Sequence, residues 1–548
     1  MGKFFAFALL FFPIIVDAIS QLRRNKNATE LEKPSFRSLQ VQKDFQPLLC
    51  NAKLLSVTCT AWSTAFGTGN VHTNRVIIPC GQCITMNHAG TILNLRGGFE
   101  IVGKLVIPNK TKINIVTTTV IIQGELQATS SKPVDGKPDV KITLTGSDDI
   151  NFTPIDRNAN ACRGNTTCSV GKKAVVVAGG KLNGMYFGSE RAKKVTHYSG
   201  NLPMRMFLYL VVRGIPSNTP TWTRLYDVSG GTYNKPTTIL LPSVVKGRWA
   251  VGAQILITSH TRIWNEHQQR TITRVVDSPV SGYVAITLDS AIIRPTTLVE
   301  SKDYAVEVAL LSRNILLVGG TDTTARHGGH LMIMNTPSVE QSIIGLELQN
   351  FGQQGYLGRY PIHFHFCNDV SGSIVAQNSI RQSNQRCIVV HGTNKLRISE
   401  NIAYDTKGHC YMTEDGIETG NEFISNLGAQ TGIPEVLIPN MGTNGLETDN
   451  EPATFWITSP TNSWIGNVAA GSIHSAYWFE AKLRGDRASL FPNKDPMFDP
   501  IILFKDNVAH SSMGSTVRSD MLICACTTYV MSHTHVSHSC AIGRIAFV

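Results

Sequence analysis

The sequence reads LELQN at 346–350, IVAQN at 374–378, LRISEN at 396–401 and EFISN at 422–426, each an apolar run that ends in asparagine. SWIGN at 463–467 and LFKDN at 503–507 continue the pattern. Successive asparagines are 28, 23 and 25 residues apart, and then about 40. Short strands at such periods predict a parallel β-helix with one coil per repeat, in which the longer steps carry loop insertions. A leucine-rich solenoid is the rival, but it would need a helical half-repeat, which is not seen.

The first 315 residues are also rich in strand patterns. Runs such as TILNLRGGFEIVGKLVI (91–107), KAVVVAGG (173–180) and GYVAITLDS (282–290) alternate β-branched residues with glycine or asparagine turns. Period-two alternation without helical periodicity indicates strands. The chain is therefore predicted to be all-β. Asparagines stacked at one turn of each coil would satisfy buried backbone groups, which gives them a structural role.

The N-terminus carries the pattern of a secretory signal peptide. A positive start at Met1–Lys3 precedes an apolar run, Phe4–Val16, and small residues follow at Val16-Asp17-Ala18. We expect cleavage after residue 18 and secretion, with an uncleaved anchor as the alternative. No other stretch is long and apolar enough to span a membrane. Four glycosylation sequons agree with this compartment and begin at Asn27, Asn109, Asn151 and Asn165.

Twelve cysteines in an oxidising compartment suggest disulfide bonds. Cys162 and Cys168 bracket a polar loop and form the best local pair. Cys50 with Cys59 and Cys80 with Cys83 are further pairings, although the sequence does not fix the connectivity. Cys80-Gly-Gln-Cys83 also has the spacing of half a zinc site, but no second half follows.

Charge and composition narrow the partners. Hydrophobic residues make up 42% and charged residues 16% of the 548-residue chain, which excludes disorder. A formal net charge of +11 favours acidic partners such as polyanionic glycans or membrane surfaces. We expect an acidic polysaccharide and no nucleic acid.

Chemically useful side chains are densest in three consecutive coils. These coils contain RYPIHFHF (359–366), NQRCIVVHGT (384–393) and KGHCYMTEDGIE (407–418). His391 and Glu414 each lie 13 residues after a repeat asparagine, so they should stack, as should Cys387 and Cys410 four residues earlier. Neighbouring rungs are about 4.8 Å apart, which lets side chains at matching places converge.

The preceding coil offers two histidines to this stack. His363 is the match by the count from Asn350, whereas His365 is the match by the Arg-Tyr-Pro approach, and both share one strand face. His363, His365 and His391 are therefore candidate ligands of a divalent metal. His391, Glu414 and Asp415 are candidate catalytic residues. A structural stack of polar side chains is the competing interpretation.

Glu414 and Asp415 are adjacent, so they should point to opposite faces and should not form a glycosidase pair by themselves. Asp369, Asp405 and Glu418 are candidate partners for Glu414. Substrate binding is assigned to a separate group of side chains, which could hold a uronate carboxylate. This group comprises Arg359, Tyr360 and Arg386.

These same strings, together with ATFWITSPTNSWIGNVAAGS (453–472), carry a family resemblance. From about Trp62 to Ser512 the chain resembles the family of the cell-migration-inducing hyaluronan-binding protein and the transmembrane hyaluronidase, and more distantly fibrocystin-like proteins. The resemblance implies a right-handed parallel β-helix after an eight-glycine-type domain, a place outside the cell or at its surface, and hyaluronan binding or cleavage. It also implies dependence on calcium, and it draws attention to His409.

The chain departs from that family in two ways. It has no membrane-spanning helix, which resembles the secreted member, and its tail from Met521 keeps no family pattern. The expected organisation is a signal peptide (1–18), a linker (19–50), an eight-glycine-type β domain (51–195), a β-rich connection (196–318), a parallel β-helix (319–515) and an atypical tail (516–548).

The leading functional hypothesis is a secreted protein that hydrolyses a hyaluronan-like polysaccharide. Glu414 would be the general acid or base, and Arg386 would hold the uronate. A lyase is the alternative within enzymes, because a uronate also permits β-elimination. A non-catalytic glycan-binding or receptor-like protein and a structural matrix protein are the other classes.

Overall fold

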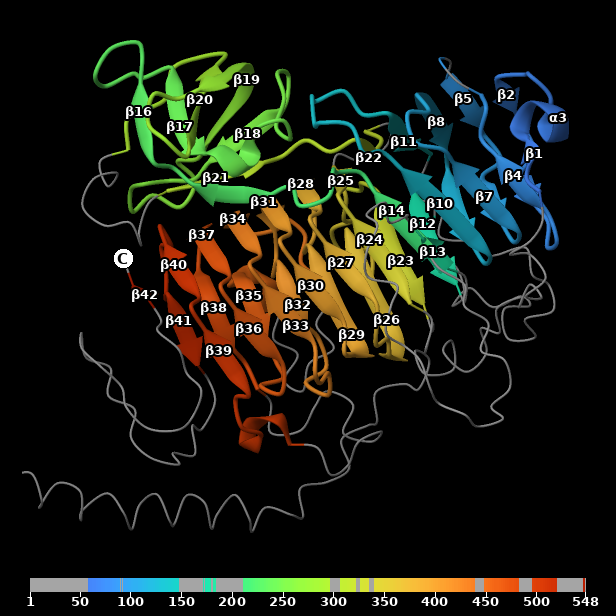
Figure 1. Cartoon of the computed structure of the whole chain (residues 1–548). Coiled ribbons are helices and arrows are strands. Elements are labelled where there is room, and N and C mark those ends of the chain that lie inside the picture. The colour runs from blue at the N-terminus through green and yellow to red at the C-terminus, as the bar shows by residue number, and fades with distance from the viewer. Residues whose placement is uncertain are drawn as a thin grey trace, which may run out of the picture.

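The computed structural model describes residues 58–88, 90, 92–146, 171, 173–178, 181–183, 210–295, 306–321, 326–334, 340–438, 448–481, 495–519 and 546–547. Most of its strands lie in three long parallel sheets, with a fourth, antiparallel sheet beside them (Figure 1).

The strands of each parallel sheet follow one another in chain order. The first sheet consists of β1 (Thr60–Ala61), β4 (Cys83–Thr85), β7 (Lys104–Ile107), β10 (Glu125–Thr129), β13 (Lys181–Asn183), β14 (Leu210–Arg213), β24 (Gln341–Ile344), β27 (Ile374–Ala376), β30 (Arg397–Ser399), β33 (Glu422–Ile424), β36 (Ser463–Ile465) and β39 (Leu503–Lys505). The second consists of β2 (Val71–His72), β5 (Ile92–Leu95), β8 (Ile113–Thr117), β11 (Val140–Leu144), β22 (Ile315–Gly319), β25 (Leu346–Gln349), β28 (Ser379–Ser383), β31 (Ile402–Lys407), β34 (Leu427–Gly432), β37 (Val468–Ser472), β40 (Val508–His510) and β42 (Ala546–Phe547). The third consists of β3 (Val76–Ile78), β6 (Phe99–Ile101), β9 (Thr119–Ile122), β12 (Ala174–Ala178), β23 (His330–Met334), β26 (Ile362–Asp369), β29 (Ile388–Asn394), β32 (Tyr411–Thr413), β35 (Ala453–Ile457), β38 (Ser475–Phe479) and β41 (Val517–Ser519).

Each coil gives one strand to each sheet in turn, as β27, β28 and β29 do before β30, β31 and β32. Matching strands of these two coils pair in parallel. The predicted all-β class and parallel β-helix are confirmed. The coils also run through the first third of the chain, because β11 pairs with β22 and β12 with β23 (blue to yellow in Figure 1).

A buried ladder of asparagines joins successive coils between the first and second sheets. Asn401 Oδ1 accepts the backbone N–H of Asn378 at 3.0 Å and its side-chain Nδ2 at 2.9 Å. Asn401 Nδ2 donates to Val375 O and to Asn426 Oδ1, both at 2.9 Å. The same pattern continues to Asn507, as predicted for these residues. The members of the ladder are Asn378, Asn401, Asn426, Asn467 and Asn507.

Asn350 does not belong to this ladder, although its motif resembles the others. The position in register with Asn378 is Leu346, whose N–H donates to Asn378 Oδ1 across 32 residues of chain. Asn350 lies four residues later, at a turn with a positive φ of 54°, and its Nδ2 donates to Gly319 O. Asn350 was therefore the wrong starting point for the count of 13 to His363, because this coil is 32 residues long and not 28.

The antiparallel sheet forms a separate unit against the β-helix (green in Figure 1). Its strands, in spatial order, are β15 (Trp222–Arg224), β21 (Glu307–Leu310), β18 (Gln254–Ile257), β19 (Gln268–Asp277), β20 (Tyr283–Leu288), β17 (Thr238–Pro242) and β16 (Asp227–Ser229). Leu256 and Ala309 pack on Leu427 and Ala429 of β34. Trp222 Nε1 donates to Ser425 O at 2.8 Å, which adds a polar contact to this apolar interface.

The described helices are short. They are α3 (Trp62–Phe66) and the 3₁₀ turns η3 (Ser243–Val245), η4 (Thr448–Asn450) and η5 (Pro496–Phe498). Within the described ranges, no helix has the length and apolar character needed to cross a membrane.

Two disulfides among the described residues link adjacent coils. Cys59 pairs with Cys83, so the pairings of Cys50 with Cys59 and of Cys80 with Cys83 were wrong. The second bond joins Cys387 to Cys410, at the two positions that were expected to stack.

Several predicted modification sites lie outside the described residues, namely the leader, Asn27, Asn151, Asn165, Cys162 and Cys168. Asn109 is described; it is exposed at the turn between β7 and β8, and its side chain is hydrogen-bonded to Ser131.

Candidate functional site

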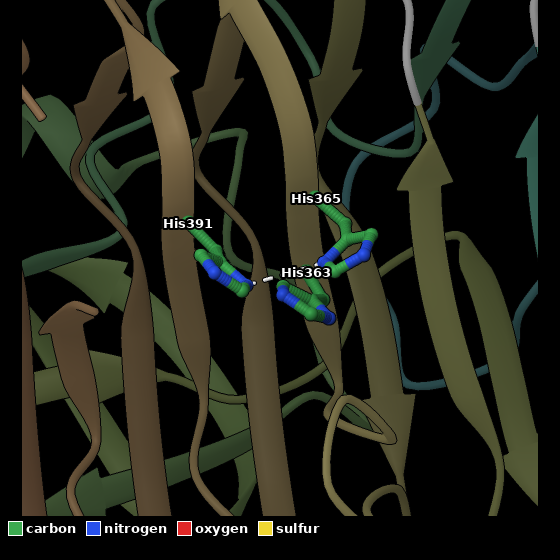
Figure 2. A group of neighbouring side chains, drawn as sticks. All are labelled: His363, His365 and His391. Atoms are coloured by element: carbon green, nitrogen blue, oxygen red, sulfur yellow. Dashed lines mark hydrogen bonds between the residues drawn. The ribbon is translucent and has the colours of Figure 1, made fainter. Parts of the chain in front are cut away.

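The candidate site lies on the outer face of the third sheet, across β26, β29 and β32. Ile362 and Phe364 belong to the core inside the coils, so His363 and His365 of the same strand face outward. His365 pairs in register with His391, which selects His365 over His363 as its neighbour on the preceding coil. Figure 2 shows the three imidazole rings gathered on the two strands.

Glu414 takes the next place in this column. Its N–H donates to Val390 O at 3.0 Å, and Val390 pairs with Thr413, so Glu414 follows directly beside His391. The predicted stacking of His391 and Glu414 is borne out. The column of His365, His391 and Glu414 is called the histidine column below.

His363 is fully buried next to the column and has a defined tautomer. Its Nδ1 lies 2.9 Å from Gly358 O, which can only accept, so Nδ1 carries the proton. Burial lowers the pKa of His363 to about 4, so the ring is neutral at physiological pH. Its Nε2, with no hydrogen-bond partner in the described part of the chain, lies 3.9 Å from Glu414 Oε2.

His391 lies between two carboxylates. Its Nε2 is 2.9 Å from Asp415 Oδ2, and its Nδ1 is 3.6 Å from Glu414 Oε2. The expectation that Glu414 and Asp415 point to opposite faces was wrong. Strict alternation ends because β32 stops at Thr413 and the chain turns at Gly416, where φ is +83°.

Glu418 holds this turn. It is fully buried and its carboxylate accepts the N–H groups of Gly392, Asp415 and Gly416 at 2.9–3.0 Å. Burial and the nearby Asp415 raise the pKa of Glu418 to about 7, although the backbone donors act in the opposite direction. Its role is to position Asp415 against His391.

Arg386 brings a positive charge to the same place. Its Nη1 lies 3.9 Å from Glu414 Oε2 and its Nη2 lies 3.6 Å from Asp449 Oδ2. Its guanidinium also stands over the Tyr360 ring, 4.7 Å from the centroid. Burial alone would lower the pKa of Arg386, but Tyr360, Asp449 and Glu414 together raise it. Nε and Nη1 have no hydrogen-bond partner among the described residues.

Arg359 and His409 have other roles. Arg359 Nη1 donates to Gln353 Oε1 at 2.6 Å, and its guanidinium covers the Tyr356 ring. His409 Nδ1 accepts the N–H of Ala453, its Nε2 contacts Thr448 Oγ1, and its ring stacks on Trp456. These contacts make His409 a packing residue.

The other candidate partners of Glu414 also lie elsewhere. Asp369 is exposed and paired with Lys395, and Asp405 accepts from Gln430 on the second sheet.

Asp449, in η4, was missed by the sequence analysis. It is buried, accepts from Gln385 Nε2 at 2.6 Å and from the N–H of His409 at 3.2 Å, and faces Arg386. The contacts of Arg386 and His409 hold the pKa of Asp449 low although burial opposes this. Asp449 follows a long insertion between coils, so no repeat position marked it.

The three histidines could hold a metal ion. One nitrogen from each of His363, His365 and His391 lies within 4.8 Å of the other two. Calcium does not fit this donor set, because Ca²⁺ is bound by six to eight oxygen ligands rather than by imidazole. No catalytic step is therefore assigned to calcium at this place.

Comparison with known protein families finds a match in two parts of the chain. Residues 63–199 match the G8 domain and residues 326–517 match the CEMIP β-helix. The human cell surface hyaluronidase CEMIP2 is 34% identical over 304 residues, which cover 48% of this chain and 22% of that protein. A cell surface hyaluronidase of Danio rerio is 35% identical over 254 residues, covering 39% of this chain and 18% of that protein.

A relative with a different name also matches about half of the chain. Communication mutant protein F of Dictyostelium discoideum is 32% identical over 280 residues, covering 48% of this chain and 24% of that protein. The matched stretch thus spans about a quarter or less of the length of these three relatives.

Proposed function

We propose that this chain, which joins a G8 domain to a CEMIP β-helix and is homologous to cell surface hyaluronidases, cleaves a hyaluronan-like acidic polysaccharide by hydrolysis. The observation that carries the proposal is the convergence of Arg386, Glu414, Asp415 and the histidines on the outer face of three neighbouring strands.

Glu414 is the proton-transfer residue in this proposal. Hydrolysis of a glycosidic bond requires proton donation to the leaving oxygen and proton removal from the attacking water. Glu414 Oε2 is buried and makes no hydrogen bond within the described ranges, so no hydrogen bond to this oxygen has to break when the carboxyl group transfers a proton. The His391 ring faces Glu414 through Nδ1. Asp415 contacts Nε2 of the same ring and thereby holds its orientation.

Arg386 is the substrate-binding residue for the uronate. The Nε and Nη1 donors of Arg386 are buried and make no hydrogen bond within the described chain, so each can form a charge-assisted hydrogen bond with a carboxylate oxygen. Tyr360 and Asp449 hold the guanidinium in place from the other side. Loss of Arg386 should therefore weaken binding of the acidic polymer more than binding of a neutral one.

The test uses purified full-length protein and hyaluronan of defined length. Chain length followed by light scattering should fall with the wild type, and Glu414→Gln should slow this by about 10²–10⁴-fold, the usual contribution of a general acid or base. Glu422→Gln, on an exposed glutamate paired with Arg397, is the matched control and should keep full activity. Full cleavage by Glu414→Gln would falsify the site.

Two further readouts separate the alternatives. Ultraviolet absorbance of the product would reveal the unsaturated sugar that a lyase leaves and that hydrolysis does not. Binding of hyaluronan without any loss of its length would indicate a non-catalytic glycan-binding protein. The buried polar atoms of His363 and Arg386 that make no hydrogen bond within the described residues favour this second function over a structural matrix protein.

We also propose that the protein is secreted, with a cleaved leader and a glycan at Asn109. The exposed side chain of Asn109, the two disulfides and the cell-surface relatives support this. Enzymatic deglycosylation of protein recovered from culture medium should reduce its mass, and Asn109→Gln should remove one such step.

A further inference from the structure

We propose that His363, His365 and His391 bind one first-row transition-metal ion of the zinc class, and that Gly358 and Asp415 hold the rings in the ligating tautomers. The sequence left the identity of the ion open. The ring geometry, the neighbouring charges and the donor type favour such an ion whether or not the chain cuts a polysaccharide.

The ring nitrogens that point away from the proposed ion have the partners expected at a metal site. Metal-binding histidines usually direct their second nitrogen to a carbonyl or carboxylate, which fixes the tautomer and makes the ligating nitrogen more basic. His363 Nδ1 faces Gly358 O at 2.9 Å, and His391 Nε2 faces Asp415 Oδ2 at 2.9 Å. Both rings therefore turn a nitrogen lone pair, His363 Nε2 and His391 Nδ1, toward the same space.

The distance between two of the ring nitrogens is close to that between the ligands of a zinc ion. In a tetrahedral zinc site with Zn–N bonds of about 2.1 Å, ligand nitrogens are about 3.4 Å apart. His365 Nδ1 and His391 Nδ1 are already 3.1 Å apart, and the third nitrogen lies within 4.8 Å of both (Figure 2). Two of the three nitrogens therefore lie close to the spacing of zinc ligands, and His363 supplies the third.

The negative charge beside the histidines also favours a cation. Glu414 and Asp415 place two carboxylates beside His391, whereas the nearby Arg386 is partly balanced by Asp449. Two positive charges on an ion would compensate the two carboxylates. Glu414 Oε2, at 3.6 Å from His391 Nδ1 and 3.9 Å from His363 Nε2, stands where a fourth ligand or a water-activating base would be needed.

The donor type selects the ion. Three imidazole nitrogens suit zinc, copper, nickel or iron, whereas calcium and magnesium require oxygen ligands. Zinc and cobalt are therefore the probes. Calcium should neither bind this triad nor displace zinc from it.

The experiment measures metal binding by the untagged full-length protein. After treatment with a chelator and dialysis, Zn²⁺ is titrated in competition with a chromophoric chelator, and bound metal is counted by elemental analysis. We expect one tightly bound zinc per chain. Co²⁺ in the same site should give the intense visible absorption of a tetrahedral ion.

The variants locate the ion. His363→Gln and His391→Gln should each lower the Zn²⁺ affinity by at least about 100-fold, and Asp415→Asn by about 10–100-fold. His474→Gln, on a half-exposed histidine near Glu451, is the matched control and should bind as the wild type does. Circular dichroism confirms that each variant is folded.

A separate variant removes the competing histidines of the tail, at positions 533, 535 and 538. It should retain one zinc. Binding lost with the tail histidines but kept in His363→Gln, or no zinc binding at all, overturns the proposal and leaves an imidazole–imidazole hydrogen bond between His365 and His391. Cleavage of hyaluronan is measured separately, so zinc binding without cleavage contradicts only the proposed function.

Discussion

The asparagine ladder and the histidine column are both stacks of polar side chains along successive coils, and they differ in whether their polar atoms are hydrogen-bonded. The asparagine ladder lies inside, between the first and second sheets, and every side-chain group of Asn401 has a partner on the coil before or after. The histidine column lies on the outer face of the third sheet, where Glu414 Oε2 and the neighbouring His363 Nε2 have no hydrogen-bond partner in the described chain.

The same cause produces both stacks. In-register coils place equivalent residues about 4.8 Å apart, whatever their chemistry. Stacking by itself therefore does not mark a functional site. Unsatisfied polar atoms in a buried place do, because leaving them unpaired costs free energy that a purely structural stack would avoid. Predictions that separate stability from activity should distinguish the two stacks.

The largest loss of stability is expected when the asparagine ladder is broken. Asn401→Ala leaves the N–H and Nδ2 groups of Asn378 and the carbonyl of Val375 without their partner. At about 1–3 kcal/mol for each buried group, the free energy of unfolding should fall by about 4 kcal/mol. Urea unfolding measures it. Asn234→Ala, on an exposed asparagine, should change it by less than about 0.5 kcal/mol. A loss below about 1 kcal/mol for Asn401→Ala would show that the ladder is replaceable.

The next largest loss of stability is expected when the disulfide between two coils of the site is removed. Replacing both Cys387 and Cys410 by alanine opens a loop with a sequence separation of 23 residues, so the free energy of unfolding should fall by about 3 kcal/mol. Cys367→Ala, on another buried cysteine, controls for the lost sulfur volume. Equal losses in the two variants would mean that packing, and not the cross-link, holds these coils.

The sequence predicted the stacks better than it predicted what the stacks do. The intervals of 23 and 25 residues gave the true register from Asn378 to Asn426, because hydrogen bonds between asparagines allow no slippage. Asn350 broke the pattern, since a motif of the same letters lies at a turn four residues beyond the in-register position. The Arg-Tyr-Pro match corrected this for His365, because it compares the entry into the strand itself.

Other parts of the site depend on features that have no period. Asp415 reaches His391 only because the chain turns after β32, and Glu418 fixes that turn through three backbone N–H groups. Asp449 arrives from an insertion far along the chain. Neither turn geometry nor insertions can be counted from a repeat, so these contacts could not be predicted.

A third prediction uses a partly buried histidine outside the site. His267, in the loop between β18 and β19, accepts the Ser259 N–H at Nδ1 and contacts Trp264 O through Nε2, so both ring nitrogens are satisfied. Burial lowers the pKa of His267 to about 4 with a smaller contribution from His510, whereas the hydrogen bond to Trp264 O and the charge of Glu307 act in the opposite direction. Because the unfolded chain binds a proton near pH 6.5 and the folded one only near pH 4, stability is lost as the pH falls between these values.

From pH 7 to pH 5 this single group should reduce the free energy of unfolding by about 2 kcal/mol. His267→Asn keeps an acceptor for Ser259 but cannot be protonated, so its unfolding should depend less on pH by that amount. Parallel pH profiles of wild type and variant, recorded by thermal unfolding, would refute this role for His267.

The smallest expected effect on stability belongs to the histidine column. Glu414→Gln should change the free energy of unfolding by less than about 0.5 kcal/mol, because Glu414 Oε2 makes no hydrogen bond within the described residues and its three nearest nitrogens are 3.6–3.9 Å away. Glu418→Gln, four residues later, should cost about 1 kcal/mol or more, because that carboxylate accepts three backbone N–H groups. Urea unfolding of the two variants gives the comparison. Since both glutamates lie on the same turn and undergo the same chemical change, only their hydrogen bonding distinguishes them. A larger loss for Glu414 than for Glu418 would mean that the column, like the ladder, serves the fold.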